Sequence, residues 1–129
     1  MFDHLSLGVR NLTKARRFYD ALLGPLGHGV AKASETELAY GPGGRGAHFF
    51  LYPIARGRVA GRGAHVAFGT VSREAVDRAY AGAIEAGAAA VRPAGAHPDL
   101  APDYYGAVLL DPDGNRLEIV AAPAATPSG

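Results

Sequence analysis

The feature that most constrains this chain is an internal repeat. The segment HLSLGVRNLTKARRFYDALLG begins at His4, and the segment HVAFGTVSREAVDRAYAGAIEAG begins at His65. A shift of 61 residues aligns four pairs of identical residues: His4 with His65, Gly8 with Gly69, Arg17 with Arg78 and Tyr19 with Tyr80. Self-similarity at a fixed shift indicates repeated structural units that bury a common core by packing together. The sequence therefore predicts two modules of similar fold.

Each half predicts the same order of elements: a strand, a helix and roughly three further strands. The helix of the first half is indicated by apolar residues at helical spacing, namely Ala15, Phe18, Tyr19, Leu22 and Leu23. Asn11 and Ser72 precede the two helices and can cap them. The expected strands lie at 2–9, 28–33, 36–40, 47–54, 64–71, 88–92, 104–110 and 116–120, and the expected helices at 14–23 and 73–87.

These elements predict an α+β chain of two tandem βαβββ modules. Module one covers about 1–54 and module two about 64–121, within a single domain over 1–121. The Pro-rich segment 92–102 is predicted to be a loop, and 122–129 a flexible tail.

Composition excludes several classes of function. The chain of 129 residues has a formal net charge of +1, which does not indicate a nucleic-acid partner. It contains no cysteine, so thiol catalysis is excluded and any metal must use His, Asp or Glu. No apolar run approaches the roughly 18 residues of a membrane span, and no signal peptide is recognisable. We therefore expect a cytoplasmic protein without a membrane partner.

One carboxylate stands out in the segment LLDPDGNRLEIV. Glu118 lies among Leu117, Ile119 and Val120 in a predicted strand, after a turn with the sequence DPDGN. A buried carboxylate has to be paired or has to coordinate a metal ion. The sequence therefore predicts a partner for Glu118.

Three segments together resemble the vicinal oxygen chelate superfamily of glyoxalase I, bleomycin-resistance proteins and extradiol dioxygenases. They are HLSLGVRNLTKARRFYDALLG, GAHVAF and DPDGNRLEIV, and the resemblance spans about residues 2–121. It implies that eight strands curl into an open cup that holds one divalent metal ion. By position, the implied metal ligands are His4, His65 and Glu118. Phe50 takes the fourth position, where it cannot ligate.

Two imidazoles and one carboxylate form a triad that leaves coordination positions open. Iron, zinc, nickel and manganese all suit such a set. The implied function is a metal-dependent lyase, isomerase or dioxygenase acting on a small substrate that chelates through adjacent oxygens. A metal-free antibiotic-binding protein of the bleomycin-resistance type is the alternative. A third hypothesis is a protein whose role is assembly and whose cup is only a relic. The resemblance also implies a homodimer, with the site either in one chain or across the interface.

Further candidate residues surround the predicted cup. Tyr104 and Tyr105 are candidate catalytic phenols, and alternation along a strand sends them to opposite faces. His48 lies two residues before Phe50, so both are expected on one face, as substrate-binding residues or, for His48, as a dimer contact. His97, in the predicted loop, is either a mobile substrate-binding group or a solvated side chain.

Overall fold

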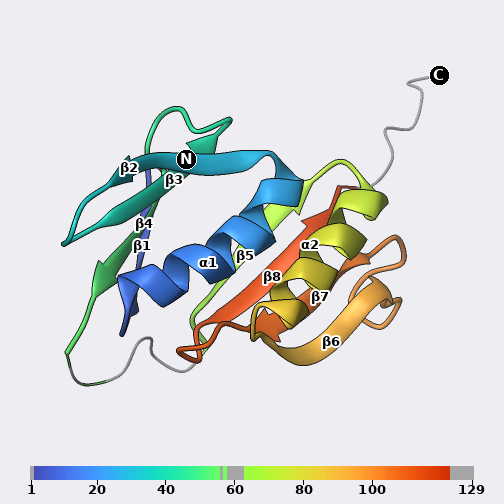
Figure 1. Ribbon diagram of the computed structural model, residues 1–129. Helices are drawn as coiled ribbons and strands as arrows, with labels where there is room; N and C mark the ends of the chain where they lie inside the picture. Colours follow the sequence, from blue (N-terminus) through green and yellow to red (C-terminus); the bar gives the residue numbers. More distant parts are fainter. Residues whose placement is uncertain (1, 56, 58–62, 123–129) are drawn as a thin grey trace.

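The computed structural model describes residues 2–55, 57 and 63–122. Within these residues the chain forms eight strands, two α-helices and one short 3₁₀ helix at Gly24–Leu26 (Figure 1). In chain order the main elements are β1 (Leu5–Val9), α1 (Leu12–Leu23), β2 (His28–Ala33), β3 (Leu38–Pro42), β4 (Phe49–Pro53), β5 (His65–Thr70), α2 (Arg73–Glu85), β6 (Ala89–Ala96), β7 (Tyr105–Leu110) and β8 (Arg116–Ala121).

The strands of the described residues form two sheets of four, one from each half of the chain. The strand orders are β1-β4-β3-β2 and β5-β8-β7-β6, so the two halves have the same topology. In both sheets the first strand pairs in parallel with the last, and the other pairs are antiparallel. The predicted α+β class and the two tandem βαβββ modules are confirmed. The predicted tail lies outside the described residues, except for Ala122.

Both helices begin where the sequence predicts a capping side chain. The side chain of Asn11 accepts a hydrogen bond from the Lys14 amide at 2.9 Å. The Ser72 hydroxyl accepts one from the Ala75 amide at 3.1 Å. These side chains satisfy amide groups that have no partner within the first helical turn. No helix in the described part of the chain is long and apolar enough to cross a membrane.

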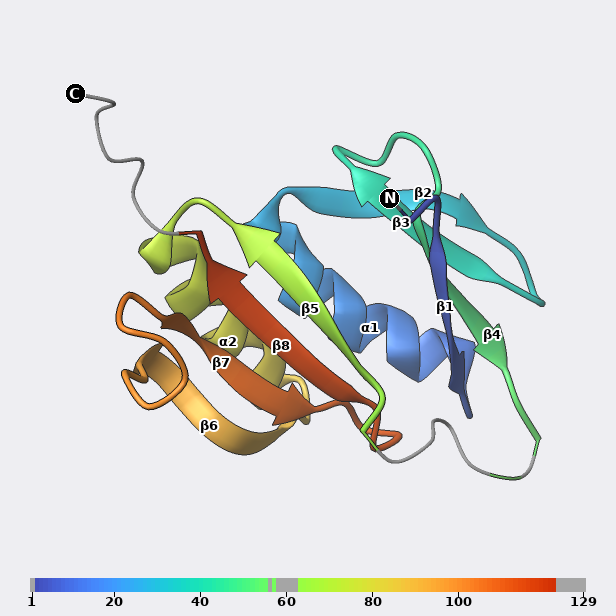
Figure 2. The same ribbon diagram turned by 180° about the vertical axis from the view of Figure 1, so that it is seen from behind.

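The two helices lie on the same side of the sheets. Figure 1 shows the helices in front of the strands, and Figure 2 shows the strands from the opposite side. The core between helices and sheets is shared by both modules. Its largest fully buried members include Phe18, Tyr19, Leu22, Leu51, Leu109, Leu117 and Ile119. We call the other side of each sheet, which no helix covers, its open face.

The DPDGN turn joins the second module to the first. Asp111 is 4% exposed and accepts a hydrogen bond from the Tyr19 hydroxyl at 2.6 Å. The Asn115 amide nitrogen donates to the carbonyl oxygen of Gly8 at 3.0 Å. Arg10 pairs with Asp113 at 3.2 Å. The turn therefore fixes the position of β8 relative to β1 and α1.

Strand β6 is longer than the sequence predicts. It continues through Pro93 to Ala96, whereas the prediction ended the strand at 92 because of the proline. Its register with β7 shifts between Ala90 and Arg92 and again between Arg92 and Gly95. Proline is tolerated in an edge strand at such an irregularity because its missing N–H is not needed there. The predicted loop over 93–96 was therefore wrong.

Candidate active site

The pleat of β8 separates Glu118 from its apolar neighbours. Leu117 and Ile119 are fully buried on the side of the helices, and Glu118 projects from the open face with 19% of its side chain exposed. Side chains alternate between the two faces of a strand, so sequence neighbours of Glu118 do not surround it. The expectation of a carboxylate enclosed by Leu117 and Ile119 was therefore wrong.

Both oxygens of Glu118 have a polar neighbour on the open face. The Tyr104 hydroxyl donates to Oε2 at 2.7 Å, and Nε2 of His65 lies 3.4 Å from Oε1. Burial, together with the hydrogen bond to Glu118, raises the pKa of Tyr104. The phenol therefore keeps its proton at neutral pH and acts as a donor. Glu118 has the partners that the sequence demanded, and they come from β5 and from the residue before β7.

The contact that Nδ1 of His65 makes determines the tautomer of the ring, and thereby whether Nε2 presents a hydrogen or a lone pair to Glu118. Nδ1 lies 3.4 Å from the carbonyl oxygen of Gly63, and a carbonyl oxygen only accepts hydrogen bonds. Nδ1 therefore carries the hydrogen in the neutral ring, which leaves the lone pair of Nε2 facing a carboxylate. Such a pair needs a proton or a cation between its atoms. Two ligand atoms that are each about 2.1 Å from a tetrahedrally coordinated ion lie about 3.4 Å from each other. The distance between Nε2 of His65 and Oε1 of Glu118 therefore fits a shared divalent ion.

His4 lies on the other sheet, just before β1. Nδ1 of His4 lies 2.8 Å from Oδ1 of Asp3, and its ring contacts Phe50 edge-on, with 5.4 Å between centroids. Leu5, the residue after His4, lines a small pocket together with His65, but His4 itself contacts Asp3 and Phe50 and makes no contact with Glu118 that closes a metal site. Among the described residues, no three His, Asp or Glu side chains come together as a metal site. The structure therefore brings His65 and Glu118 together and leaves His4 with Phe50.

The two predicted tyrosines separate as alternation requires. The Tyr104 hydroxyl reaches Glu118, whereas the Tyr105 hydroxyl donates to Asp77 of α2 at 2.6 Å. The guanidinium of Arg73, also on α2, lies 4.8 Å from the centroid of the Tyr105 ring. Tyr105 thus lies on the side of the helices, so of the two candidate catalytic phenols only Tyr104 lies beside Glu118.

His97 lies against Tyr104. The two ring centroids are 5.9 Å apart, and the backbone amide of His97 donates to the Tyr104 carbonyl oxygen at 3.3 Å. Nε2 of His97 lies 2.7 Å from the carbonyl oxygen of Pro93, to which it donates. These contacts place His97 at the edge of the cluster formed by His65, Tyr104 and Glu118.

The sequence did not reveal an ion pair beside this cluster. Arg92 is in register with Val108, which is in register with Glu118, so Arg92 shares the open face. Its guanidinium binds both carboxylate oxygens of Asp99, at 2.9 and 3.2 Å. The pair could have been found only from the register of β6, because the predicted strand ended at Arg92.

His48 and Phe50 were predicted to share one face of the strand, but their contacts differ. Phe50 stacks on Tyr52, with an angle of 4° between the rings. Nδ1 of His48 lies 3.0 Å from the carbonyl oxygen of Asp3, and His48 lines a cavity together with Phe49. His48 precedes β4, so its ring is directed by the contact with Asp3 rather than by the alternation of the strand.

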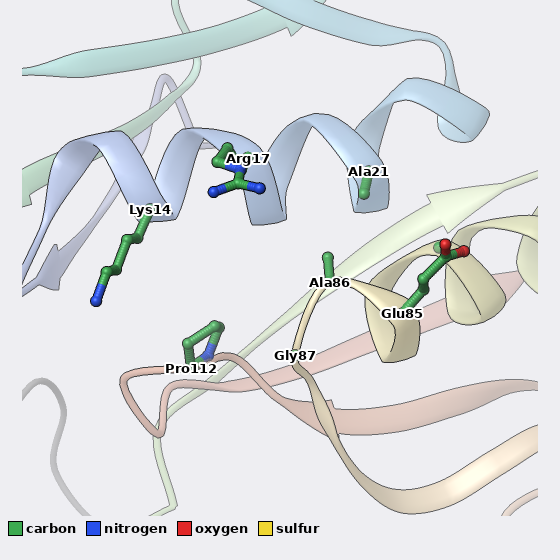
Figure 3. A pocket seen from close by; sticks show the side chains of 8 residues that line it. Lys14, Arg17, Ala21, Glu85, Ala86, Gly87 and Pro112 are labelled. Atoms are coloured by element: carbon green, nitrogen blue, oxygen red, sulfur yellow. The ribbon is translucent and has the colours of Figure 1, made fainter.

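Another surface groove lies between the two helices. It measures about 660 Å³ and is lined by Lys14, Arg17, Ala21, Gly82, Glu85, Ala86, Gly87 and Pro112. Figure 3 shows Lys14 and Arg17 projecting over it from α1. No residue that the sequence nominates for the site lines this groove, so the cluster around Glu118 remains the candidate active site.

Comparison with known proteins supports the family that the sequence resembles. A search of curated proteins found no match. A glyoxalase/bleomycin resistance protein from Albidiferax ferrireducens has a crystal structure that is 32% identical, covers 95% of this chain and 99% of its own, and superposes with a TM-score of 0.81.

Two further crystal structures share the fold at lower identity. A putative glyoxalase from Bacillus halodurans is 24% identical, with 95% of this chain and 96% of its own covered and a TM-score of 0.72. A family enzyme from Burkholderia phytofirmans is 21% identical, with 92% and 96% covered and a TM-score of 0.70. The family model itself matches residues 1–119. The chain belongs to the Glyoxalase/Bleomycin resistance protein/Dioxygenase superfamily.

Proposed function

We propose that this protein is a divalent-metal-dependent enzyme acting on a small substrate that chelates through two adjacent oxygens. The observation that carries the proposal is the 3.4 Å approach of His65 Nε2 to Glu118 Oε1 on an open sheet face. An imidazole lone pair and a carboxylate held at this spacing are suited to one shared cation. Iron, zinc, nickel and manganese each match this donor set.

The third ligand in this proposal is His4 from a second copy of the chain. His4 is exposed just before β1 and, among the described residues, does not form a three-ligand group with His65 and Glu118 of its own chain. A two-fold symmetric dimer presents the same surfaces of both copies to each other. In such a dimer the open face that carries His4 in one copy can face the open face that carries Glu118 in the other copy. The two-fold axis then produces two equivalent sites. The predicted homodimer is thereby part of the proposed site.

A bound divalent ion supplies a Lewis acid that polarises a substrate oxygen. Around it, Tyr104 holds a proton on its hydroxyl next to Glu118 and orients that carboxylate. Gly63 holds His65 in the tautomer that presents Nε2. Phe50, stacked on Tyr52, offers an apolar wall in the position where a second carboxylate would otherwise stand. In this proposal the reaction is that of a lyase, an isomerase or a dioxygenase.

Metal analysis tests the proposal directly. We expect untagged protein to retain a near-stoichiometric divalent ion, measured by elemental analysis after loading and dialysis. Glu118→Gln keeps the shape of the side chain but removes its charge, and should lose the ion. Glu85→Gln makes the same change in the groove between the helices and should retain it. Equal metal content in Glu118→Gln and the wild type would refute the proposed site.

Mixing two variants tests whether the site spans two chains. His4→Ala and Glu118→Gln each damage every site of their own dimers. If the ligands come from different copies, a mixed dimer regains one intact site, so about a quarter of all sites should recover metal after random exchange. If the ligands come from one chain, no recovery is expected. The second result would place the site within a single chain.

A metal-free binding protein is the second candidate. It is favoured because His4, His65 and Glu118 do not form a three-ligand group within the described residues of one chain. In that case the site holds no metal, and the open faces bind an organic molecule such as an antibiotic. Failure of the wild type to take up any of the four metals, together with saturable binding of an organic molecule, would favour this alternative.

A further inference from the structure

A second cavity lies beside β5, where none of the candidate metal ligands His4, His65 and Glu118 lines it. It measures about 250 Å³, near the end of α1, where the first module meets β5. Phe49, Tyr40 and Leu23 contribute to it from the first module, and Val66 and Phe68 from the second. The ring centroids of Phe49 and Phe68 are 5.2 Å apart, which closes the cavity at the junction of the two modules.

The size of this cavity matches a single substituted ring. An apolar cavity of roughly 150 Å³ in another protein stays dry and binds benzene. A cavity of about 250 Å³ therefore accommodates a benzene ring that carries one or two small groups. Its lining side chains are apolar apart from the imidazoles of His28 and His48 and the hydroxyl of Tyr40. The Tyr40 hydroxyl is occupied by Asp20, to which it donates at 2.8 Å.

The two imidazoles decide which polar group a ligand has to carry. Nδ1 of His48 lies 3.0 Å from the Asp3 carbonyl oxygen, so Nδ1 is the donor and the neutral ring keeps its lone pair on Nε2. Burial, together with the nearby His48, lowers the pKa of His28, so this ring is uncharged at neutral pH. A neutral imidazole nitrogen with a lone pair accepts a hydrogen bond. The matching ligand group is an uncharged donor such as a hydroxyl.

We propose that this cavity is a binding site for a small phenol, whose ring lies among Leu23, Phe49 and Phe68 and whose hydroxyl donates to His48. None of His65, Tyr104 and Glu118 lines this cavity, so the proposal does not depend on the function proposed for that cluster. Phe49 and Phe68 face the helices, whereas Glu118 projects from the other face of its sheet. The cavity comes nearest to Glu118 at Ala67, its register partner in β5. The chain can therefore hold a phenol without using its candidate metal ligands.

Calorimetric titration with p-cresol and with toluene tests this site. The two molecules have similar rings, but only p-cresol carries a hydroxyl. We expect saturable 1:1 binding of p-cresol and an affinity for toluene about tenfold lower, as for the loss of one hydrogen bond. His48→Leu should lower the affinity for p-cresol to that for toluene while leaving toluene binding unchanged. A role of His48 in folding alone would change the binding of both molecules.

Two variants locate the bound ring. Leu5 lines the cavity and is 40% exposed, so Leu5→Trp should block the entrance without disturbing the core. Leu100→Trp is the matched control, because Leu100 is 46% exposed and lies outside the cavity. Glu118→Gln should bind p-cresol as the wild type does.

A measurement on the wild type alone avoids any effect of the variants on folding. The ring resonances of His28 and His48 in NMR spectra should shift on addition of p-cresol, and those of His65 should not. The absence of saturable p-cresol binding would overturn the proposal. Loss of binding in Glu118→Gln, with binding retained in Leu5→Trp, would also overturn it.

Discussion

The hydroxyl of Tyr19, in the helix of the first module, donates to Oδ2 of Asp111, in the last turn of the second module, at 2.6 Å. Both residues are buried, and their separation in sequence is 92 residues. Asp111 also accepts hydrogen bonds from the amides of Asp113 and Asn115 and from the side chain of Asn115. The carboxylate is thus satisfied by groups from both modules, which couples their folding.

Tyr19→Phe should destabilise the protein by about 1.5–3 kcal/mol, because it removes a hydrogen bond to a buried charged group. Urea unfolding followed by circular dichroism measures the change. Tyr52→Phe removes the same atom from a ring that is 38% exposed and should change the free energy of unfolding by less than about 0.5 kcal/mol. If both variants changed the free energy of unfolding equally, the hydrogen bond from Tyr19 to Asp111 would not contribute to stability.

Stability should decrease in alkaline solution through Tyr19 and Tyr40. Burial, followed by the interactions with Asp111 and Asp20 respectively, raises both pKa values above the ordinary 10.0. Above about pH 10 the unfolded chain releases these protons while the folded chain keeps them, so the unfolded state binds fewer protons. The free energy of unfolding should be fully retained below pH 10 and fall as the pH rises further. Tyr19→Phe should show a shallower decrease, measured by urea unfolding between pH 8 and pH 11.

Gly82 is required where the two helices approach each other. A Cβ atom on Gly82 would lie 2.8 Å from the backbone oxygen of Ala21, too close for either helix to remain in place. Gly82→Ala should therefore destabilise the protein by about 1–3 kcal/mol, although alanine favours helix. Gly69→Ala adds the same atom in β5 with nothing within 4 Å and serves as the control. An increase in melting temperature for Gly82→Ala would contradict this packing.

The fold was predictable because the repeat and the local signals agree. His4 and His65 mark equivalent positions, and Asn11 and Ser72 cap the helices as expected. The approach of His65 to Glu118 agrees with the ligand set that the family resemblance implies, and the parallel pairing of β5 with β8 produces it. These features depend on contacts within one module, which the pattern of apolar residues determines.

The relation between the modules was not predictable in the same way. The position of His4 relative to Glu118 depends on how two finished sheets pack on two helices, and no periodicity in the sequence encodes that arrangement. The role of Asp111 was missed because turn residues look alike whether or not a distant tyrosine binds them. The extension of β6 through Pro93 was missed because a local signal for a loop is overridden by pairing with β7.

Tyr104→Phe should weaken metal binding in the proposed site while leaving the fold intact. The Tyr104 hydroxyl is the donor to Oε2 of Glu118, and groups that orient a metal ligand commonly contribute 10–100-fold in metal affinity. Tyr105→Phe removes the same atom from the neighbouring residue, which bonds Asp77 on the other face, and should leave metal affinity unchanged. Competition with a chromogenic chelator measures both affinities, and circular dichroism verifies the fold. If Tyr105→Phe weakened metal binding as much as Tyr104→Phe does, orientation of Glu118 by Tyr104 would not explain the effect, and a general loss of stability in the second module would have to account for it.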